Sequence, residues 1–163
     1  MASPFVRPAS LDDAAALGES HYWCWQEGYA DLLPGEALAL ATIGNRTDMW
    51  TRVLTKDPAG TFVVETADDR VAGLINCAPS RDDDASPNTG EVLAFYVRQQ
   101  WWGTGCGSAL MAVGLQWLVE QGFAEATLWL LYPNPSAQRL PLTHAWRPHR
   151  ATENPSCLGH ELA

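Results

Sequence analysis

The chain has 163 residues, which is enough for one domain with its own hydrophobic core. Hydrophobic residues make up 47% and charged residues 18% of it, and this composition excludes an intrinsically disordered chain. The net charge of −9 argues against nucleic acid as a partner, because phosphate binding needs a basic surface; it is compatible with a cationic partner or with plain solubility. The sequence shows no apolar run long enough to span a bilayer and no signal peptide, so we expect no membrane association.

The cysteines and histidines show no metal-binding spacing. Cysteines stand at positions 24, 77, 106 and 157 without a CxxC motif, and the four histidines form no HxxxH pair. We therefore expect no metal site. Buried free thiols in a reducing cytoplasm are the expected state of the cysteines.

The first half of the sequence predicts one strand, two helices and a hairpin. A strand is expected at residues 5–9, and Ser10 with acids at 12 and 13 predicts a capped helix that runs to about Tyr29. A second helical stretch is expected from about Glu36 to Leu54, interrupted at Gly44-Asn45. Residues 61–66 and 71–77 predict a hairpin. The polar loop at 81–90 is acidic, which is typical of a solvated loop and leaves a metal-binding cluster as the alternative.

The second half predicts a parallel strand pair. A strand is expected at 91–97, a helix at 108–121 and a strand at 126–131, and this order implies a right-handed crossover between parallel strands. A short helix from Asn134 and two short strands near Trp146 and Leu158 follow. The whole chain, residues 1–163, is thus expected to form a single α/β domain with a mixed sheet and helices on both faces. The elements do not alternate strictly, which disfavours a doubly wound dinucleotide fold.

A glycine-rich turn separates the predicted strand from the predicted helix. It reads Gly103-Thr104-Gly105-Cys106-Gly107-Ser108. Glycine lets a backbone approach a ligand closely, and amides at a helix N-terminus form an anion site suited to a diphosphate. A tight turn without a ligand is the alternative. No Gly-Lys-Ser/Thr follows, as a P-loop requires, and the GxxG spacing of the dinucleotide fingerprint is missing.

The stretch from Glu91 through this turn to the strand at 126–130 resembles motif A of the GNAT N-acetyltransferases. Asn134, Ala137, Arg139 and Trp146-Arg147-Pro148 resemble that family's next motif, and Val6-Arg7-Pro8-Ala9 with Trp25…Tyr29 is more loosely similar. The resemblance implies a mixed, mostly antiparallel sheet with a central splayed parallel strand pair. It also implies acetyl-CoA as co-substrate and direct acetyl transfer to an amine of a small molecule or peptide, with a homodimer as a family-level expectation.

The resemblance also assigns roles to residues. Glu91 is the candidate general base, expected on the same face of its strand as Leu93, Phe95 and Val97, with a glutamate at the solvent edge as the alternative. The amide of Val97 or Tyr96 is the expected oxyanion donor. The aromatic residues Trp23, Trp25 and Tyr29 line an acceptor pocket or belong to the core. The residues expected to contact the cofactor are Phe95, Tyr96, Val97, Trp102, Gly103, Thr104, Gly105, Cys106, Gly107, Ser108, Asn134 and Ala137.

Two positions depart from the family pattern. Pro141 occupies the position of the usual tyrosine acid and has no proton to donate. Tyr96, Tyr132, Thr143 and His144 are alternative donors, and a thiolate can also leave unaided. Trp102 stands where glutamine or arginine is usual. These departures keep open a degenerate domain that binds acetyl-CoA with little or no transfer.

Overall fold

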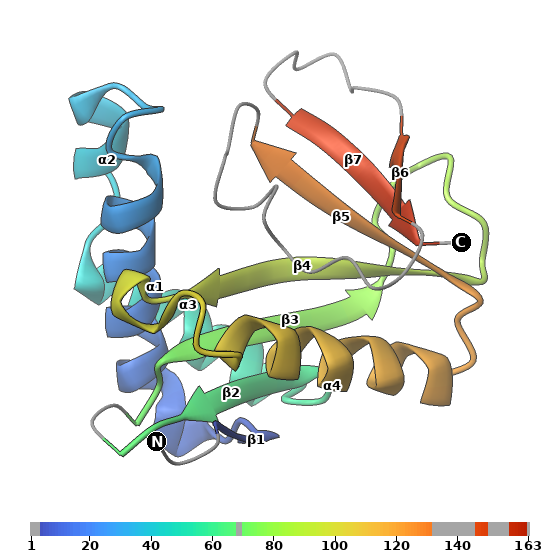
Figure 1. The fold of residues 1–163 in the computed structure, drawn as a ribbon, viewed down its shortest axis with the longest axis horizontal. Coiled ribbons are helices and arrows are strands. Elements are labelled where there is room, and N and C mark those ends of the chain that lie inside the picture. Colours follow the sequence, from blue (N-terminus) through green and yellow to red (C-terminus); the bar gives the residue numbers. More distant parts are fainter. Residues whose placement is uncertain (1–3, 68–69, 132–145, 150–156, 163) are drawn as a thin grey trace.

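The computed structural model describes residues 4–67, 70–131, 146–149 and 157–162 (Figure 1). These residues form a seven-stranded sheet in the order β1-β2-β3-β4-β5-β7-β6. Only β4 and β5 are parallel, and every other neighbouring pair is antiparallel. The mixed, mostly antiparallel sheet is therefore confirmed. The strands are β1 Phe5–Pro8, β2 Thr61–Glu65, β3 Gly73–Pro79, β4 Thr89–Val97, β5 Glu125–Leu131, β6 Trp146–His149 and β7 Cys157–Leu162.

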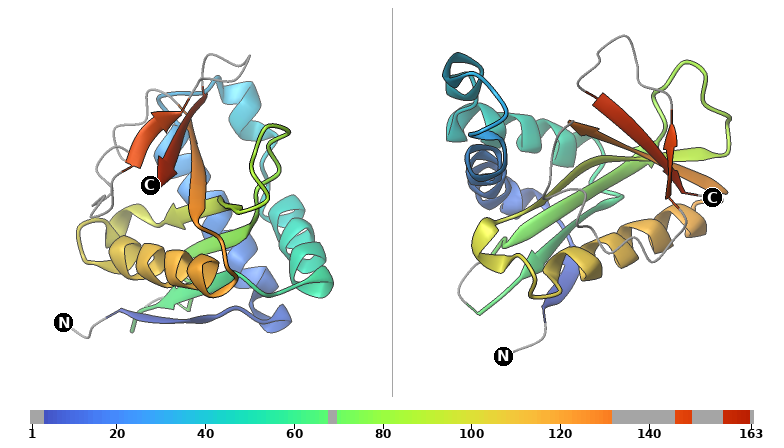
Figure 2. Two further views of the ribbon diagram at one scale, coloured as in Figure 1. Left: turned by 90° about the vertical axis from the view of Figure 1, so that its right-hand side faces the viewer. Right: turned by 45° about the horizontal axis from the view of Figure 1, so that its top comes forward.

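Helices cover both faces of the sheet (Figures 1 and 2). Helices α1 (Ala14–Tyr29) and α3 (Ile43–Lys56) lie on one face and α4 (Cys106–Glu120) on the other, with the short α2 (Gly35–Ala39) beyond the end of α1. Two short 3₁₀ turns, η1 (Leu11–Asp13) and η2 (Gln99–Trp101), precede α1 and α4. No helix among the described residues is both long and apolar enough to cross a membrane.

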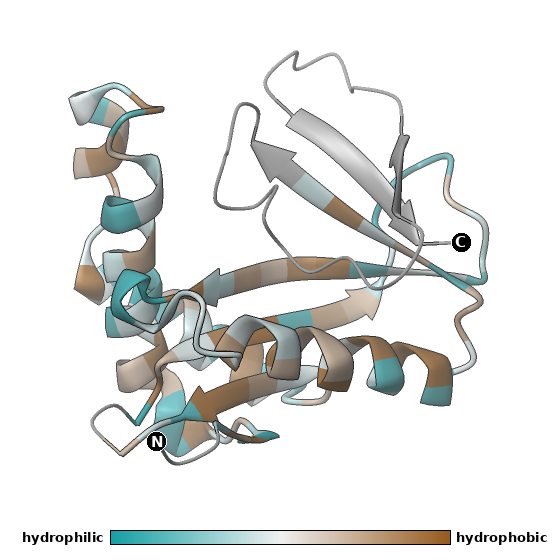
Figure 3. Cartoon of the chain, in the orientation of Figure 1, coloured by the Kyte–Doolittle hydropathy of each residue, from teal (hydrophilic) through white to brown (hydrophobic). Residues whose placement is uncertain are grey.

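Each face of the sheet has its own hydrophobic core. On the α4 face, Ile75, Val92 and Leu110 belong to one cluster of buried side chains. On the α1/α3 face, Leu17, Trp50, Val63 and Leu74 belong to a second cluster. The hydrophobic residues concentrate on the central strands and along the helices that cover them (Figure 3). Alternate residues of β2 and β3 therefore enter different cores, as the period of a strand requires.

The break between α2 and α3 covers residues 40–42 and so lies before the predicted position. The expected interruption at Gly44-Asn45 is wrong, because Thr42 caps α3: its Oγ1 accepts a hydrogen bond from the Asn45 amide at 3.1 Å. The Asn45 Oδ1 in turn accepts from the Thr42 amide at 3.0 Å. These reciprocal bonds satisfy two backbone N–H groups at the start of α3. Asn45 therefore belongs to the first turn of a helix here and does not end one.

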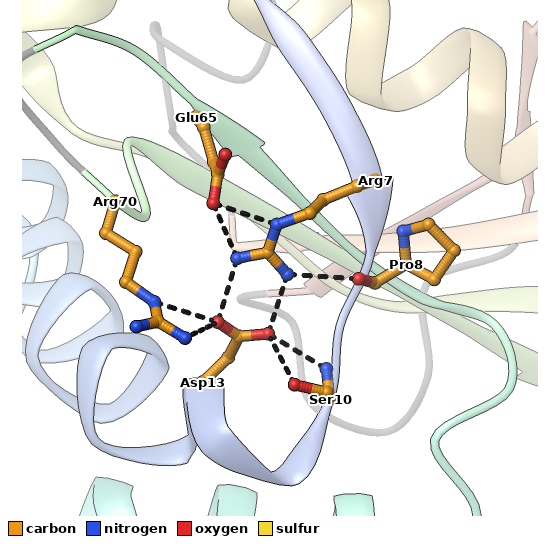
Figure 4. Close-up of polar contacts among 6 residues, drawn as sticks. All are labelled: Arg7, Pro8, Ser10, Asp13, Glu65 and Arg70. Carbon is orange, nitrogen blue, oxygen red and sulfur yellow. Dashed lines mark hydrogen bonds and ion pairs between the residues drawn. The ribbon is translucent and has the colours of Figure 1, made fainter.

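A buried carboxylate joins β1 and β2 to the start of α1 (Figure 4). Asp13 is fully buried, and its Oδ2 accepts from Arg7 Nη1 at 2.7 Å while its Oδ1 accepts from Arg70 Nη2 at 3.0 Å. The Ser10 amide donates to Oδ2 at 2.9 Å, and Arg7 also pairs with Glu65 at 2.6 Å. The hydrogen bonds from Arg7 hold the pKa of Asp13 well below its usual range. A charged carboxylate is stable at this position because each oxygen has cationic and polar donors.

Candidate functional site

The parallel strands β4 and β5 separate half-way along their length. They pair from Thr89 opposite Glu125 to Val92 opposite Leu128. Beyond these residues β4 continues to Val97 and β5 to Leu131 with no pairing between them. Figure 1 shows the two strands diverging. The expected splayed pair is confirmed, and the second half of β4 has an edge that β5 leaves unpaired.

An inserted residue in β4 marks the point of divergence. Against β3, Val92 pairs with Cys77 and Ala94 with Asn76, so Leu93 is an extra residue in a β-bulge. The bulge reverses the alternation of side chains along β4. Val92 on one side of the bulge and Phe95 on the other both pack against the α4 cluster, three positions apart.

The bulge places Glu91 on the face that α1 and α3 cover. Glu91 pairs with Ala78 and precedes Val92, which belongs to the α4 face. It therefore shares its face with Ala94 and Tyr96, which pack against the α1/α3 cluster. The expectation that Glu91 shares a face with Phe95 and Val97 is wrong, because a count by twos does not hold across an inserted residue.

The free edge of β4 presents backbone groups of Val97. The Arg98 amide donates to the Ala72 carbonyl at 3.0 Å, so the alternation of an antiparallel ladder directs the N–H and C=O of Val97 away from β3. The same alternation directs those of Tyr96 toward β3. Of the two amides expected to stabilise an oxyanion, the Val97 amide is the one on the open side. The Val97 carbonyl accepts a hydrogen bond from Trp102 Nε1 at 2.8 Å, which places the Trp102 side chain at this edge.

The glycine-rich turn leads from this edge into α4. Gly103 has φ +75° and Gly105 has φ +93°, left-handed conformations that side chains rarely adopt. A Cβ atom on either glycine would meet nothing within 4 Å, so the outer side of the turn is open. Within the described part of the chain, no group accepts a hydrogen bond from the amides of the first turn of α4, residues 106–108. Free amides at the positive end of a helix fit an anion such as a diphosphate.

The cysteine in the turn is not available as a nucleophile. Cys106 is 2% exposed, and its Sγ accepts a hydrogen bond from Thr104 Oγ1 at 3.3 Å. Cys24 and Cys77 are also buried free thiols, and burial raises the pKa of each to about 12. The expected buried free thiols are thus confirmed for the three cysteines whose side chains are described. No group of three metal-ligating side chains occurs among the described residues.

Glu91 is buried in an ion pair with the loop that follows β3. Its side chain is 3% exposed, and its two oxygens accept from the Arg81 amide at 3.0 Å and from Arg81 Nη2 at 3.2 Å. The Arg81 side chain is 71% exposed and therefore screened by solvent. The carboxylate is in place either to accept a proton or to anchor the loop.

The aromatic residues of α1 divide between two faces of the helix. His21, Trp25 and Tyr29 are spaced by four and lie on one face, where the His21 ring stacks on Tyr96 with centroids 4.4 Å apart. Trp23 lies on another face and lines a hollow of about 570 Å³ between α1 and α2. The structure thus brings Trp25 and Tyr29 together and leaves Trp23 apart from them.

His21 is a neutral buried base in this cluster. Its Nδ1 accepts a hydrogen bond from Trp50 Nε1 at 3.2 Å. Burial, with a contribution from the charge of Arg46, lowers its pKa to about 3. His21 and Arg46 were not predicted as site residues, although the four-residue spacing of His21, Trp25 and Tyr29 is a signal for a shared face.

The model of the acetyltransferase (GNAT) family matches residues 14–142. The chain belongs to this family. Among curated proteins it is similar to the uncharacterized N-acetyltransferase YuaI of Bacillus subtilis, with 27% identity over 149 residues that cover 91% of this chain and 82% of YuaI.

Solved GNAT structures share the fold. The PaiA N-acetyltransferase of Thermoplasma acidophilum, solved with coenzyme A, superposes with a TM-score of 0.82 at 16% identity, and the match covers 99% of both chains. The protein yncA of Salmonella typhimurium, solved with acetyl-CoA, gives a TM-score of 0.68 at 17% identity, and the match covers 99% of this chain and 94% of that one.

Several expected site residues of this GNAT chain lie outside the described part of the structure. They are Asn134, Ala137, Pro141 and three of the alternative acids, Tyr132, Thr143 and His144. Of the expected proton donors, Tyr96 is described. Its hydroxyl is largely buried, and burial raises its pKa.

Proposed function

We propose that the protein is an acetyl-CoA-dependent N-acetyltransferase that moves the acetyl group directly to an amine. The observation that carries this proposal is the open edge of β4 leading into a turn of unpaired amides, in a chain of the GNAT family. The presence of coenzyme A in the PaiA structure and of acetyl-CoA in the yncA structure supports it.

The residues at the edge fit the parts of this co-substrate. The amides of residues 106–108 are suited to the diphosphate, and the N–H and C=O of Val97 can pair with an extended arm as an added strand would. Trp102 then has to release the Val97 carbonyl, which its indole occupies in this structure. The bound thioester supplies an activated acyl group next to the bulge.

The protein contributes to the transfer in three ways. The amine nitrogen attacks the acyl carbon, a C–N bond forms and the C–S bond breaks. We assign stabilisation of the developing oxyanion to the Val97 amide and removal of the amine proton, through water, to Glu91. The leaving thiolate takes up one proton, and we assign the donor to the protonated Tyr96 hydroxyl, whose pKa burial raises, so that Tyr96 is a weaker acid than a solvated tyrosine. We also place the enzyme in a reducing compartment such as the cytoplasm, because its described thiols are buried and free.

Two measurements on the purified protein test the proposal. Acetyl-CoA at about 100 times its Kd should stabilise the fold by about 2.7 kcal/mol, which a thermal melt detects. A panel of amines with acetyl-CoA should then release free thiol. Stabilisation without release for any amine would favour the degenerate binding domain, and the absence of both would reject the proposal.

Replacement of Glu91 by glutamine should lower kcat about 100-fold with little change in KM, because a positioned general base contributes at least about that factor. The measurement is steady-state thiol release with a saturating amine. The matched control is Arg81→Ala, which removes the Nη2 contact to Glu91 but keeps the backbone one. If Glu91 only anchors the loop, the two variants will lose the same activity; a full rate in Glu91→Gln would remove Glu91 from the mechanism.

A further inference from the structure

Arg46, near the start of α3, is a half-buried cation without a carboxylate partner among the described residues. The other partly buried arginines of the described chain are all paired with acids: Arg7 with Asp13 and Glu65, and Arg98 with Glu27. The protein carries a net charge of −9, so acidic partners are plentiful. A half-buried guanidinium without an acidic partner in the described part of the chain is available to bind an anion from outside it.

Two side chains that contact each other here, Arg46 and Trp25, each have a hydrogen-bond donor without a partner. The guanidinium carbon of Arg46 lies 5.0 Å from the centre of the Trp25 ring. Arg46 Nε and Trp25 Nε1 are both buried, and neither has a hydrogen-bond partner in the described structure. Native proteins seldom bury a donor without an acceptor. The missing group is therefore an acceptor, and beside a guanidinium an anionic one binds best.

This donor pair is connected to the open edge of β4. Trp25 packs edge-on against His21 with centroids 6.4 Å apart, and His21 stacks on Tyr96 at 4.4 Å. Tyr96 lies in β4 directly before Val97, whose amide faces the opening. The charge of Arg46 reaches both rings, since it acts on the pKa of His21 and of Tyr96. Arg46 and Trp25 are thus linked by two ring contacts to the residue that precedes Val97.

We infer that Arg46 and Trp25 bind a carboxylate of the acceptor, so that the enzyme acetylates amines whose molecule also carries a carboxylate. The inference rests on the proposed acetyl transfer and names the class of its substrate. A guanidinium forks onto two oxygens of a planar carboxylate, and an indole N–H adds one bond to either oxygen. Such an acceptor has no net charge, so neither the acidic surface nor the cationic Arg46 repels it as a whole.

Matched acceptors test the inference. A series of ω-amino acids of increasing chain length is compared with the corresponding ω-amino amides, which differ only in the carboxylate. At the best chain length the acid should have a kcat/KM at least about 10-fold above the amide, as a hydrogen bond to a charged group predicts. Aminoalkyl phosphates form a third arm, and a preference for them over the acids would contradict the carboxylate assignment.

Variants locate the effect. In Arg46→Gln the acid-to-amide ratio should fall to about 1, while turnover of the amides stays near wild type. Trp25→Phe, which keeps the ring and loses the N–H, should lower the ratio in part. Arg52→Gln removes the same charge from an exposed position of α3 and should keep the wild-type ratio. The inference would be overturned if Arg46→Gln, shown by thermal melt to be folded, had the same acid-to-amide ratio as the wild type.

A binding measurement separates this inference from the proposed function. The ω-amino acid alone should raise the melting temperature of the wild-type protein and of Arg52→Gln, and should have no effect on Arg46→Gln. If no amine of any kind reacts, acetyl transfer is rejected and this shift alone decides whether Arg46 binds carboxylates. If the neutral amines react and no shift or acid preference occurs, transfer stands and the carboxylate site is rejected.

Discussion

Replacement of Gly105 by valine should weaken acetyl-CoA binding at least about 100-fold and leave the fold in place. Gly105 has φ +93°, a conformation that costs a residue with a side chain about 1–2 kcal/mol and a β-branched residue more. The turn relieves this strain if its backbone rotates, and rotation aims the amides of residues 106–108 away from a common point. Calorimetric titration with acetyl-CoA measures the loss.

The control for this prediction is a second glycine with free space around it. A Cβ atom on Gly28 meets nothing within 4 Å, as at Gly105, but Gly28 lies in α1 and its φ is not positive. Gly28→Val should bind acetyl-CoA with wild-type affinity. Undiminished affinity in Gly105→Val would mean that the turn is only a connection between β4 and α4.

Replacement of Asp13 by alanine should destabilise the protein by about 3 kcal/mol, because it removes the buried carboxylate that pairs with both arginines and leaves Arg7 with Glu65 alone. For a chain of this length we expect the melting temperature to fall by about 6–12 °C. The folded-state pKa of Asp13 lies below its unfolded value, so its contribution is present at neutral pH and is lost as the pH falls below about 4. The difference between wild type and variant should therefore shrink in acid.

The neighbouring residue provides the comparison. Asp12 is exposed in the same 3₁₀ turn as Asp13, so Asp12→Ala should change stability by less than about 0.5 kcal/mol. Equal melting temperatures for the two variants would show that the arginine cluster contributes nothing to the fold. A difference that stays constant down to pH 3 would show that the pKa of Asp13 is the same in the folded and the unfolded chain.

The order of the elements could be predicted from the sequence because its signals are local. Ser10 with Asp13 begins the first helix, and strand–helix–strand spacing around α4 requires a parallel pair. The boundary between α2 and α3 could not be placed, since Asn45 is compatible with a helix start or a helix end and its bond to Thr42 decides. Family resemblance supplied the splay, which depends on contacts between distant strands.

The site was predictable along the backbone and much less so among side chains. The turn at 103–108 follows from its glycines, whose positive φ values are a property of the residue type. The face of Glu91 was predicted wrongly because nothing in the residues 91–94 distinguishes a bulge from a regular strand. Arg46 and Trp25 lie on different helices and 21 positions apart in the sequence. A contact between such distant residues leaves no local signal.

The inserted residue Leu93 affects which mutations β4 can tolerate. If it were deleted, Val92 and Ala94 could keep their present partners on β3, and we expect β4 to lose the bend that carries it away from β5. On this expectation, the opening depends on the number of residues in β4 as well as on the contacts between the strands. We therefore expect β4 to tolerate many substitutions at position 93 but no insertion or deletion.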